Sequence, residues 1–324
     1  MIRNNRFKIF FLTCFVLAAA EARIDYLLEG NKFYEKGEYA SAISQYKLAI
    51  QEGQNLSFAW FNLGNCFAQQ KEFSQAITAY RRSVELAPQF VPSWLVLGDV
   101  YTLYGSIGDA MYCYRRVVEL EEDNSYAHKW LGENALKAGD VTEAMRSFEA
   151  SLKIDPDQIE VYFALAEAHS AIKDYSGATE VLQDAVLLSP EVNDRIYSYL
   201  GYLFEQAGDS RKAVRAYEDA LAFNPKDKAL YLRIAKLQQD EDADFLALLI
   251  LEEALKNGMK DPEIYLERGL IYFEQKRLEN ALEEYKAAYL LGSHRGRIGI
   301  ENVSAMYWNQ GKKEKAREVL SLIQ

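Results

Sequence analysis

The chain has 324 residues, of which 49% are hydrophobic and 26% are charged, and its formal net charge is −11. Six prolines and the lack of a low-complexity tract argue against long disordered linkers. An acidic chain without a cluster of lysines and arginines matches the phosphate backbone of a nucleic acid poorly, so we expect no nucleic-acid partner.

The first 22 residues have the layout of a secretory signal peptide. Three basic residues precede an apolar run from Ile9 to Ala20, and Ala20-Glu21-Ala22 is a small-x-small cleavage motif. As a helix this run would be about 18 Å long, shorter than the roughly 30 Å hydrocarbon core of a bilayer. We therefore expect cleavage after Ala22, export to the periplasm or envelope of a bacterium, and no membrane span in the mature chain. An uncleaved N-terminal anchor and a buried N-terminal helix are the alternatives.

Nine alanines recur at an almost constant spacing through the rest of the chain. Six of the eight gaps between successive alanines are 34 residues long, and two are 35. A fixed period of this length indicates stacked repeats, whose extended surface suits partners better than a single reaction pocket does. The alanines are Ala42, Ala76, Ala110, Ala144, Ala178, Ala213, Ala247, Ala281 and Ala316.

Each repeat has the pattern helix, turn, helix, with its alanine numbered as position 20. Position 8 is always Gly, Ala or Ser, and we expect it to face position 20 of the second helix, because a larger residue would hold the helices apart. Large apolar residues at positions 4, 7, 11 and 24 follow helical spacing and predict a core stripe. Glycine at position 15 favours a left-handed turn, and proline at position 32 ends the second helix.

This pattern resembles the tetratricopeptide repeat, whose register recurs here as Trp60-Leu63-Gly64-Phe67, then Ala76, Tyr80 and Pro88. The resemblance covers residues 23 to 324. It implies an all-α solenoid, a right-handed superhelix of antiparallel helix pairs whose first helices line a concave face. Repeats 1 to 9 are expected at residues 23–56, 57–90, 91–124, 125–158, 159–192, 194–227, 228–261, 262–295 and 297–324.

The sequence offers little for catalysis. It contains no phosphate loop, HExxH motif, nucleophile elbow or CxxC pair. His128 and His169 fall at core positions and are expected to be packed. His294 lies in the stretch from Gly292 to Gly299, which we expect to be a linker between the last two repeats. We therefore expect no enzyme activity, no catalytic residue, no cofactor and no metal site.

Two cysteines remain after the predicted cleavage. Cys66 falls on the first helix of one repeat and Cys113 on the second helix of the next. Those helices are not nearest neighbours, so the separation should exceed what a disulfide allows. We expect two separate and mostly buried thiols.

The remaining candidate site is the concave groove that the resemblance implies. In that family, positions 2, 5, 6, 9, 12 and 13 of the first helix commonly point into the groove. Aromatic rings among amides and charges suit an extended peptide, since rings supply contact area and amides pair with a peptide backbone. The alternative is that some of these side chains, Trp130 above all, pack under a neighbouring repeat. The residues selected are Phe58, Phe61, Asn62, Asn65, Leu95, Asp99, Lys129, Trp130, Glu133, Phe163 and Tyr202, with Tyr126, Glu167, Tyr199 and Lys236 as further members.

The sequence thus predicts a scaffold or adaptor that binds a protein or peptide partner in its groove, with a monomer as the expected state. The members that bind acidic chaperone tails would need an asparagine four residues after Lys129, where Glu133 stands, so that ligand is disfavoured. Two alternatives remain open. One is a self-assembling structural module, and the other is an accessory subunit of an envelope enzyme complex.

Overall fold

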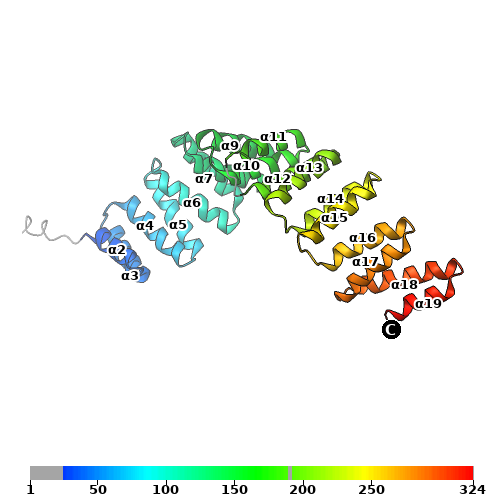
Figure 1. Ribbon diagram of the computed structural model, residues 1–324. Coiled ribbons are helices and arrows are strands. Elements are labelled where there is room, and N and C mark those ends of the chain that lie inside the picture. The colour runs from blue at the N-terminus through cyan, green and yellow to red at the C-terminus, as the bar shows by residue number, and fades with distance from the viewer. Residues whose placement is uncertain (1–24, 189–191, 324) are drawn as a thin grey trace, which may run out of the picture. The chain divides into compact units, whose positions relative to one another are not determined.

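Eighteen α-helices form the part of the chain that the computed structural model describes, residues 25–188 and 192–323 (Figure 1). They pack as antiparallel pairs, which confirms the predicted all-α repeat fold. The predicted signal peptide, residues 1–22, lies outside the described residues. The helices are α2 (Tyr26–Glu35), α3 (Tyr39–Gln51), α4 (Leu56–Gln69), α5 (Phe73–Leu86), α6 (Val91–Tyr104), α7 (Ile107–Leu120), α8 (Ser125–Ala138), α9 (Val141–Ile154), α10 (Ile159–Ala171), α11 (Tyr175–Ala185), α12 (Asn193–Gln206), α13 (Ser210–Phe223), α14 (Lys228–Asp240), α15 (Asp244–Lys256), α16 (Pro262–Glu274), α17 (Leu278–Leu290), α18 (His294–Asn309) and α19 (Lys313–Ser321).

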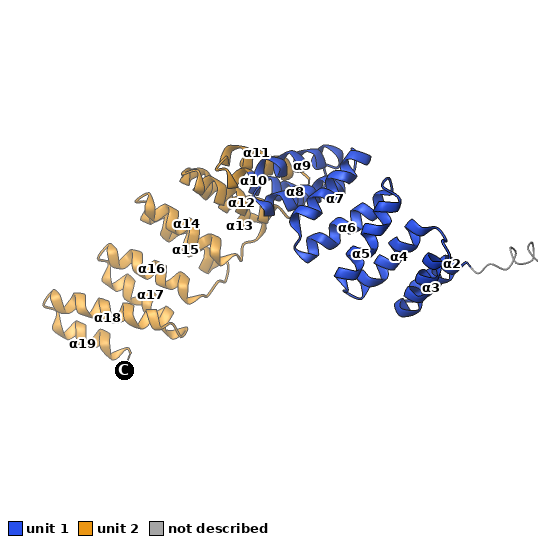
Figure 2. Cartoon of the chain, turned by 180° about the vertical axis from the view of Figure 1, so that it is seen from behind, with its two compact units in different colours: residues 1–168 blue, residues 169–324 orange. Residues whose placement is uncertain are grey.

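The chain divides into two compact units, residues 1–168 (unit 1) and residues 169–324 (unit 2) (Figure 2). In unit 1 a cluster of buried side chains runs from Ala42 on α3 to Ala127 on α8. Unit 2 contains one cluster between Ala213 and Ile271 and another between Leu266 and Val319. Within these clusters the core continues from one repeat to the next, as stacking of repeats requires.

The nearest neighbour of the glycine at position 8 is an aromatic ring at position 24, which the sequence analysis did not name beside the alanine at position 20. A methyl group on Gly64 would lie 2.6 Å from Cδ1 of Tyr80, and one on Gly132 would lie 2.6 Å from Cε1 of Phe148. Both rings are buried, so neither can move aside. The alanines at position 20 are also buried, each no more than 1% exposed. The contacts pair Gly30 with Tyr46, Gly64 with Tyr80, Gly98 with Tyr114, Gly132 with Phe148, Gly201 with Tyr217 and Gly269 with Tyr285.

The three repeats that lack this glycine also lack the ring. A leucine stands at position 24 in each of them, and it is narrower than a ring, so it leaves room for a β-carbon on the facing helix. Positions 8 and 24 therefore share a fixed volume. Glycine at position 8 with a ring at position 24 fills it, and so does alanine at position 8 with leucine at position 24. The buried pairs are Ala166 with Leu182 and Ala235 with Leu251, whereas in repeat 9 the same positions hold Ser304 and Leu320, and Leu320 is 37% exposed.

The turn inside every repeat has a left-handed residue at position 15. Five repeats have glycine there, as predicted, with φ between 76° and 85°. The other four have Lys71, Lys173, Asp242 and Lys276, with φ between 56° and 62°. A left-handed backbone brings the β-carbon close to the following carbonyl, which costs roughly 1–2 kcal/mol for a residue other than glycine. These four turns are therefore strained where the other five are not.

The predicted linker from Gly292 to Gly299 is wrong, because α18 already begins at His294. The side chain of Ser293 caps this helix by accepting a hydrogen bond from the N–H of Gly296. A methyl group on Gly296 would lie 2.6 Å from the backbone nitrogen of Tyr289, and one on Gly299 would run into the ring of Tyr285. These glycines let α18 lie close to α17 and do not loosen the chain.

The two thiols are free and buried, as the sequence predicted. Burial raises the pKa of Cys66 to about 12. Burial, with a smaller contribution from the charge of Asp109, also raises the pKa of Cys113 to about 12. Since the thiolate is the reactive form, both groups should be inert in the folded protein.

The shared volume at positions 8 and 24 predicts a non-additive double substitution. Gly132→Ala should lower the free energy of unfolding by about 1–3 kcal/mol through overpacking, and Phe148→Leu should lower it by about 1 kcal/mol. The double variant should lose less than the sum of the two, because it recreates the pair found in repeats 5 and 7. Chemical denaturation followed by circular dichroism measures all three, and strict additivity would refute the shared volume.

The turns predict two substitutions with opposite effects on stability. Lys71→Gly should raise the free energy of unfolding by up to about 1 kcal/mol, because glycine adopts a positive φ without a β-carbon penalty. Gly105→Ala should lower it by about 1–2 kcal/mol for the same reason. Urea denaturation checks both, and a shift of the same sign in the two variants would contradict the strain.

The raised thiol pKa values predict slow alkylation. At pH 8 iodoacetamide should leave Cys66 and Cys113 unmodified in the folded protein. The pKa of each thiol is raised to about 12, so both stay protonated at that pH. In urea both should react at the rate of an exposed cysteine. Peptide mass mapping after timed quenching gives the extents, and fast labelling without denaturant would show that these sites open.

Candidate functional site

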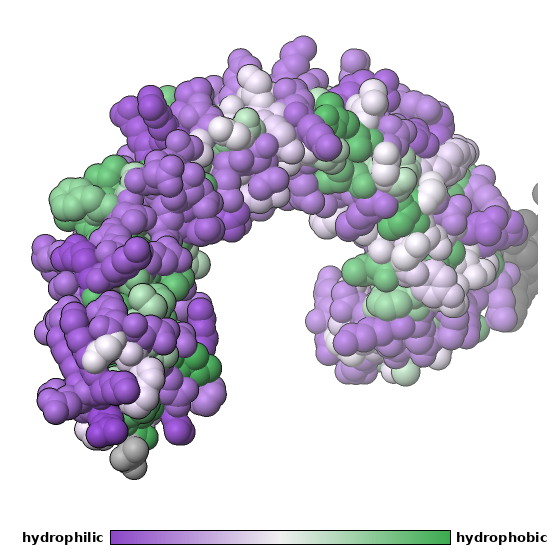
Figure 3. All heavy atoms as spheres, turned by 90° about the vertical axis from the view of Figure 1, so that its right-hand side faces the viewer, coloured by the Kyte–Doolittle hydropathy of each residue, from purple (hydrophilic) through white to green (hydrophobic). Residues whose placement is uncertain are grey.

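Hydrophilic side chains cover most of the face shown in Figure 3, and apolar ones appear there in separate patches. The groove residues predicted from the sequence lie on first helices, on α4, α6, α8 and α10 of unit 1 and on α12 of unit 2. The side chains of unit 1 fall into two groups, one aromatic and one polar. Tyr202 belongs to unit 2 and is described by itself.

An aromatic cluster forms at the start of α4. The ring of Phe90 lies 4.6 Å from that of Phe58 and 5.3 Å from that of Phe61, measured between centroids. Phe61 also lies 6.0 Å from Tyr80. Phe90 was not among the predicted residues, although an aromatic residue at the N-cap of α6, where a polar one is favoured, was a usable signal.

The amides of the first helices are joined to tyrosine hydroxyls. Tyr80 donates to Oδ1 of Asn65 over 2.7 Å, and Tyr46 donates to Oδ1 of Asn31 over 2.8 Å. Asn62 of the following repeat donates from Nδ2 to the same oxygen of Asn31 over 2.9 Å. The ring that packs on the glycine of position 8 thus also fixes the side chain at position 9.

Asp99 continues this pattern on α6 with a carboxylate. Its Oδ1 accepts hydrogen bonds from Tyr114 at 2.7 Å and from Tyr126 at 2.9 Å, and Tyr126 lies on α8 of the next repeat. Burial raises the pKa of Asp99, while these two hydrogen bonds act to lower it. The ring of Tyr126 lies 6.0 Å from that of Trp130, so the structure brings Asp99, Tyr126 and Trp130 together.

The other predicted residues are partly buried and less closely linked. Leu95 packs against the core of unit 1, and Lys129 and Glu133 lie one turn apart on α8. Trp130 is half-buried, neither fully packed under its neighbour nor fully exposed, and Phe163 on α10 is half-buried too. In unit 2, Tyr202 stacks on Tyr199 with centroids 5.9 Å apart.

Hollows occur along the second helices, where the sequence had not placed a site. Four of them repeat at equivalent positions, each between the second helix of one repeat and both helices of the next, with volumes of about 350, 510, 410 and 250 Å³. None of the predicted groove residues lines these four. The walls of all four include positions 4 and 7, and those of three also include position 11, all of which the sequence had assigned to the core alone.

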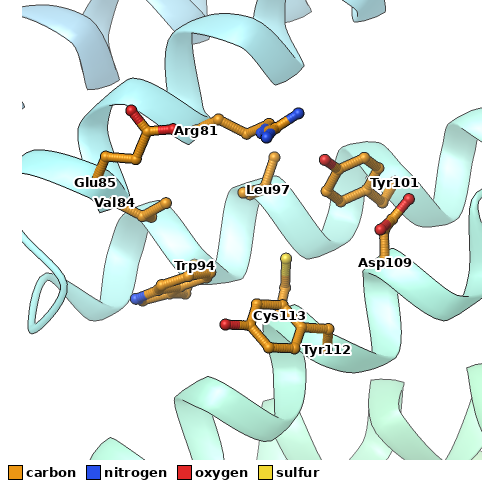
Figure 4. A pocket seen from close by; sticks show the side chains of 9 residues that line it. All are labelled: Arg81, Val84, Glu85, Trp94, Leu97, Tyr101, Asp109, Tyr112 and Cys113. Atoms are coloured by element: carbon orange, nitrogen blue, oxygen red, sulfur yellow. The ribbon is translucent and has the colours of Figure 1, made fainter.

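The hollow between α5, α6 and α7 shows how such a wall is built. Figure 4 shows Arg81 and Glu85 on one side of it and Trp94 on the other. Leu97 lies between them and Cys113 lies next to Tyr112. The rings of Trp94 and Tyr112 meet edge to face with centroids 5.9 Å apart. The nine lining residues are Arg81, Val84, Glu85, Trp94, Leu97, Tyr101, Asp109, Tyr112 and Cys113.

Two absences hold for residues 25–188 and 192–323. In that part of the chain no group of three or more His, Cys, Asp or Glu side chains is arranged to hold a metal ion. Over the same residues no helix combines the length and the apolar character needed to cross a membrane.

The comparisons with known proteins agree on one family. Models of the tetratricopeptide repeat match residues 57–90, 105–159, 135–198, 194–237 and 246–296, which together make up well over half of the chain. Protein CTR9 homolog of Arabidopsis thaliana is 24% identical over 131 residues, 39% of this chain and 12% of that protein. TPR repeat-containing protein YpiA of Bacillus subtilis is 26% identical over 131 residues, 40% of this chain and 30% of that protein. The chain spans less than a third of the length of either relative.

Two solved structures share the fold. MamA superimposes with a TM-score of 0.50 at 21% identity, over 53% of this chain and 93% of MamA. YrrB, described as a TPR protein with an unusual peptide-binding site, gives a TM-score of 0.51 at 17% identity, over 59% of this chain and 97% of YrrB. At these identities the likeness concerns the fold alone. With the matched repeats and the paired helices, it makes this chain a member of the tetratricopeptide-repeat family, with multiple tandem units.

Proposed function

We propose that this protein-binding scaffold holds an extended peptide of its partner on the first-helix face of unit 1, over α4, α6 and α8. The observation that carries the proposal is the row of side chains that tyrosine hydroxyls fix on that face. Large rings stand beside that row, and Phe58 and Tyr126 remain 40% and 43% exposed. Fixed polar groups among exposed rings are what an extended peptide requires.

These hydrogen bonds leave one donor, on Asn65, and one acceptor, on Asp99, that can pair with a peptide backbone. The oxygen of Asn65 is used by Tyr80, so its amide nitrogen can donate to a peptide carbonyl. One oxygen of Asp99 is used by two tyrosines, so the other can accept from a peptide N–H. Because both side chains are already held, binding costs little side-chain entropy on the scaffold.

The same proposal includes export to a bacterial envelope and an absence of catalysis. Export is supported by the charged, apolar and small-residue pattern of residues 1–22. A purely binding role is supported by the repeat family and by the lack of catalytic motifs in the sequence. N-terminal sequencing of the protein recovered from its host would test the cleavage after Ala22.

Peptides selected from a random display library on the purified protein should depend on this face. Asp99→Asn keeps an oxygen for the two tyrosines and replaces the acceptor offered to the peptide by a donor. Loss of a charge-assisted hydrogen bond of about 1.5–3 kcal/mol should weaken the selected peptides tenfold or more. Phe58→Ser should weaken them as well, because it removes ring contact area.

Tyr112→Ser on α7 is the matched control, since Tyr112 is 56% exposed on a second helix and lines a hollow there. The Tyr112→Ser variant should bind the selected peptides with the same affinity as the unchanged protein. Isothermal titration calorimetry gives all four affinities. Peptides that tolerate Asp99→Asn and Phe58→Ser but are lost with Tyr112→Ser would move the site to the hollows.

A further inference from the structure

Three solvent-facing positions of the second helix carry large apolar residues in repeat 7. Phe245, Leu246 and Leu249 of α15 stand at positions 18, 19 and 22 and are 75%, 45% and 50% exposed. In the other eight repeats these positions hold small, polar or charged residues, with Tyr112 as the one exception. We call the three residues the α15 patch.

The fold of repeat 7 does not use the α15 patch. The helix buries Ala247, Ile250, Leu251 and Ala254 on its other side. Scattered single apolar residues are normal on a surface, but a set that is contiguous on one helix typically marks a contact site. The patch therefore points to a partner that covers it.

A hollow of about 480 Å³ adjoins the patch within unit 2. It lies between α13, α14 and α15, and Leu246 belongs both to the patch and to the wall of the hollow. Val214, Leu237 and Ala243 give that wall further apolar surface. Its charged residues are Glu218, Glu241 and Arg211, two acidic and one basic. A partner on the patch can thus place one apolar side chain in the hollow.

Acidic residues stand at both ends of the patch. Four of the five residues from Asp240 to Asp244 are acidic, and Glu252 and Glu253 follow one turn after Leu249. Lys236 and Lys256 pair with only two of these, Asp240 and Glu252. Burial, with the nearby carboxylates of Asp219 and Glu253, raises the pKa of Glu218 across the hollow. An approaching cation would be attracted to this surround and an approaching anion repelled.

We propose that the α15 patch and the hollow beside it bind a basic amphipathic helix of a partner protein. The patch follows one stripe of α15, and a second helix covers such a stripe with its own apolar face. Because α15 is 13 residues long, or about 20 Å, a partner helix of similar length reaches from one acidic end to the other. Lysines or arginines at both ends of its apolar face meet those carboxylates. This contact uses unit 2 and does not depend on the peptide face of unit 1.

A fluorescent 18-residue peptide of leucine and lysine, with leucines at helical spacing on one face, is the probe. Fluorescence anisotropy should show micromolar binding to the full chain, weakened several-fold at high salt because the charges are screened. A twin peptide with glutamate in place of lysine should not bind. The variant Phe245→Ser/Leu246→Gln/Leu249→Thr takes the residues of repeat 2 at these positions and should bind the lysine peptide at least tenfold more weakly.

Two controls separate this result from loss of fold and from the peptide face. The triple variant changes only exposed side chains, so its helicity should equal that of the unchanged protein by circular dichroism. Asp99→Asn should bind the lysine peptide with unchanged affinity, whatever it does to peptides selected on unit 1. Equal affinity of the lysine peptide for the triple variant and the unchanged protein would overturn the proposal. So would self-association in sedimentation that the triple variant abolishes, because the patch would then join two copies of this chain.

Discussion

The contact between a bare helix backbone and a flat ring sets the geometry of most repeats. Since glycine at position 8 has no β-carbon, the ring at position 24 lies directly on the first helix and fixes how closely the pair approaches. In repeats 1 to 3 the tyrosine hydroxyl then bonds the side chain at position 9. One contact therefore places the second helix and also orients a polar group on the surface of the first.

The sequence was sufficient for features that depend on packing inside one repeat. The period, the buried alanines and the left-handed glycines all follow from positions that recur along the chain. The ring as the nearest neighbour of the glycine was missed because periodicity shows which residues face inward, but not which two of them lie closest. The stretch from Gly292 to Gly299 was wrong because glycine is normally unfavourable in a helix. Nothing in the sequence shows that Tyr285 needs a bare backbone on α16 and again on α18.

The candidate site was harder to predict, because its polar groups act through bonds between helices. The register selected Asn62, Asn65 and Asp99. It did not show that Asn31 accepts a hydrogen bond from Asn62, or that Tyr126 donates one to Asp99. The hollows along the second helices were missed for a related reason, since each is built from two repeats. Phe90 was missed because it lies just before α6, outside the first-helix positions that the register selects. A single sequence carries little signal for such pairs, because many amides and hydroxyls are equally able to bond.

The bonds from tyrosine to position 9 join residues only 15 apart in the chain. Contacts of such short range form quickly, because little chain entropy is lost when they close. These contacts can therefore close within a repeat as soon as its own second helix has left the ribosome, while the core that stabilises them forms only when neighbouring repeats stack. A half-synthesised chain, once several repeats are complete, would be able to stack them into a core, and folding would then follow the direction of translation.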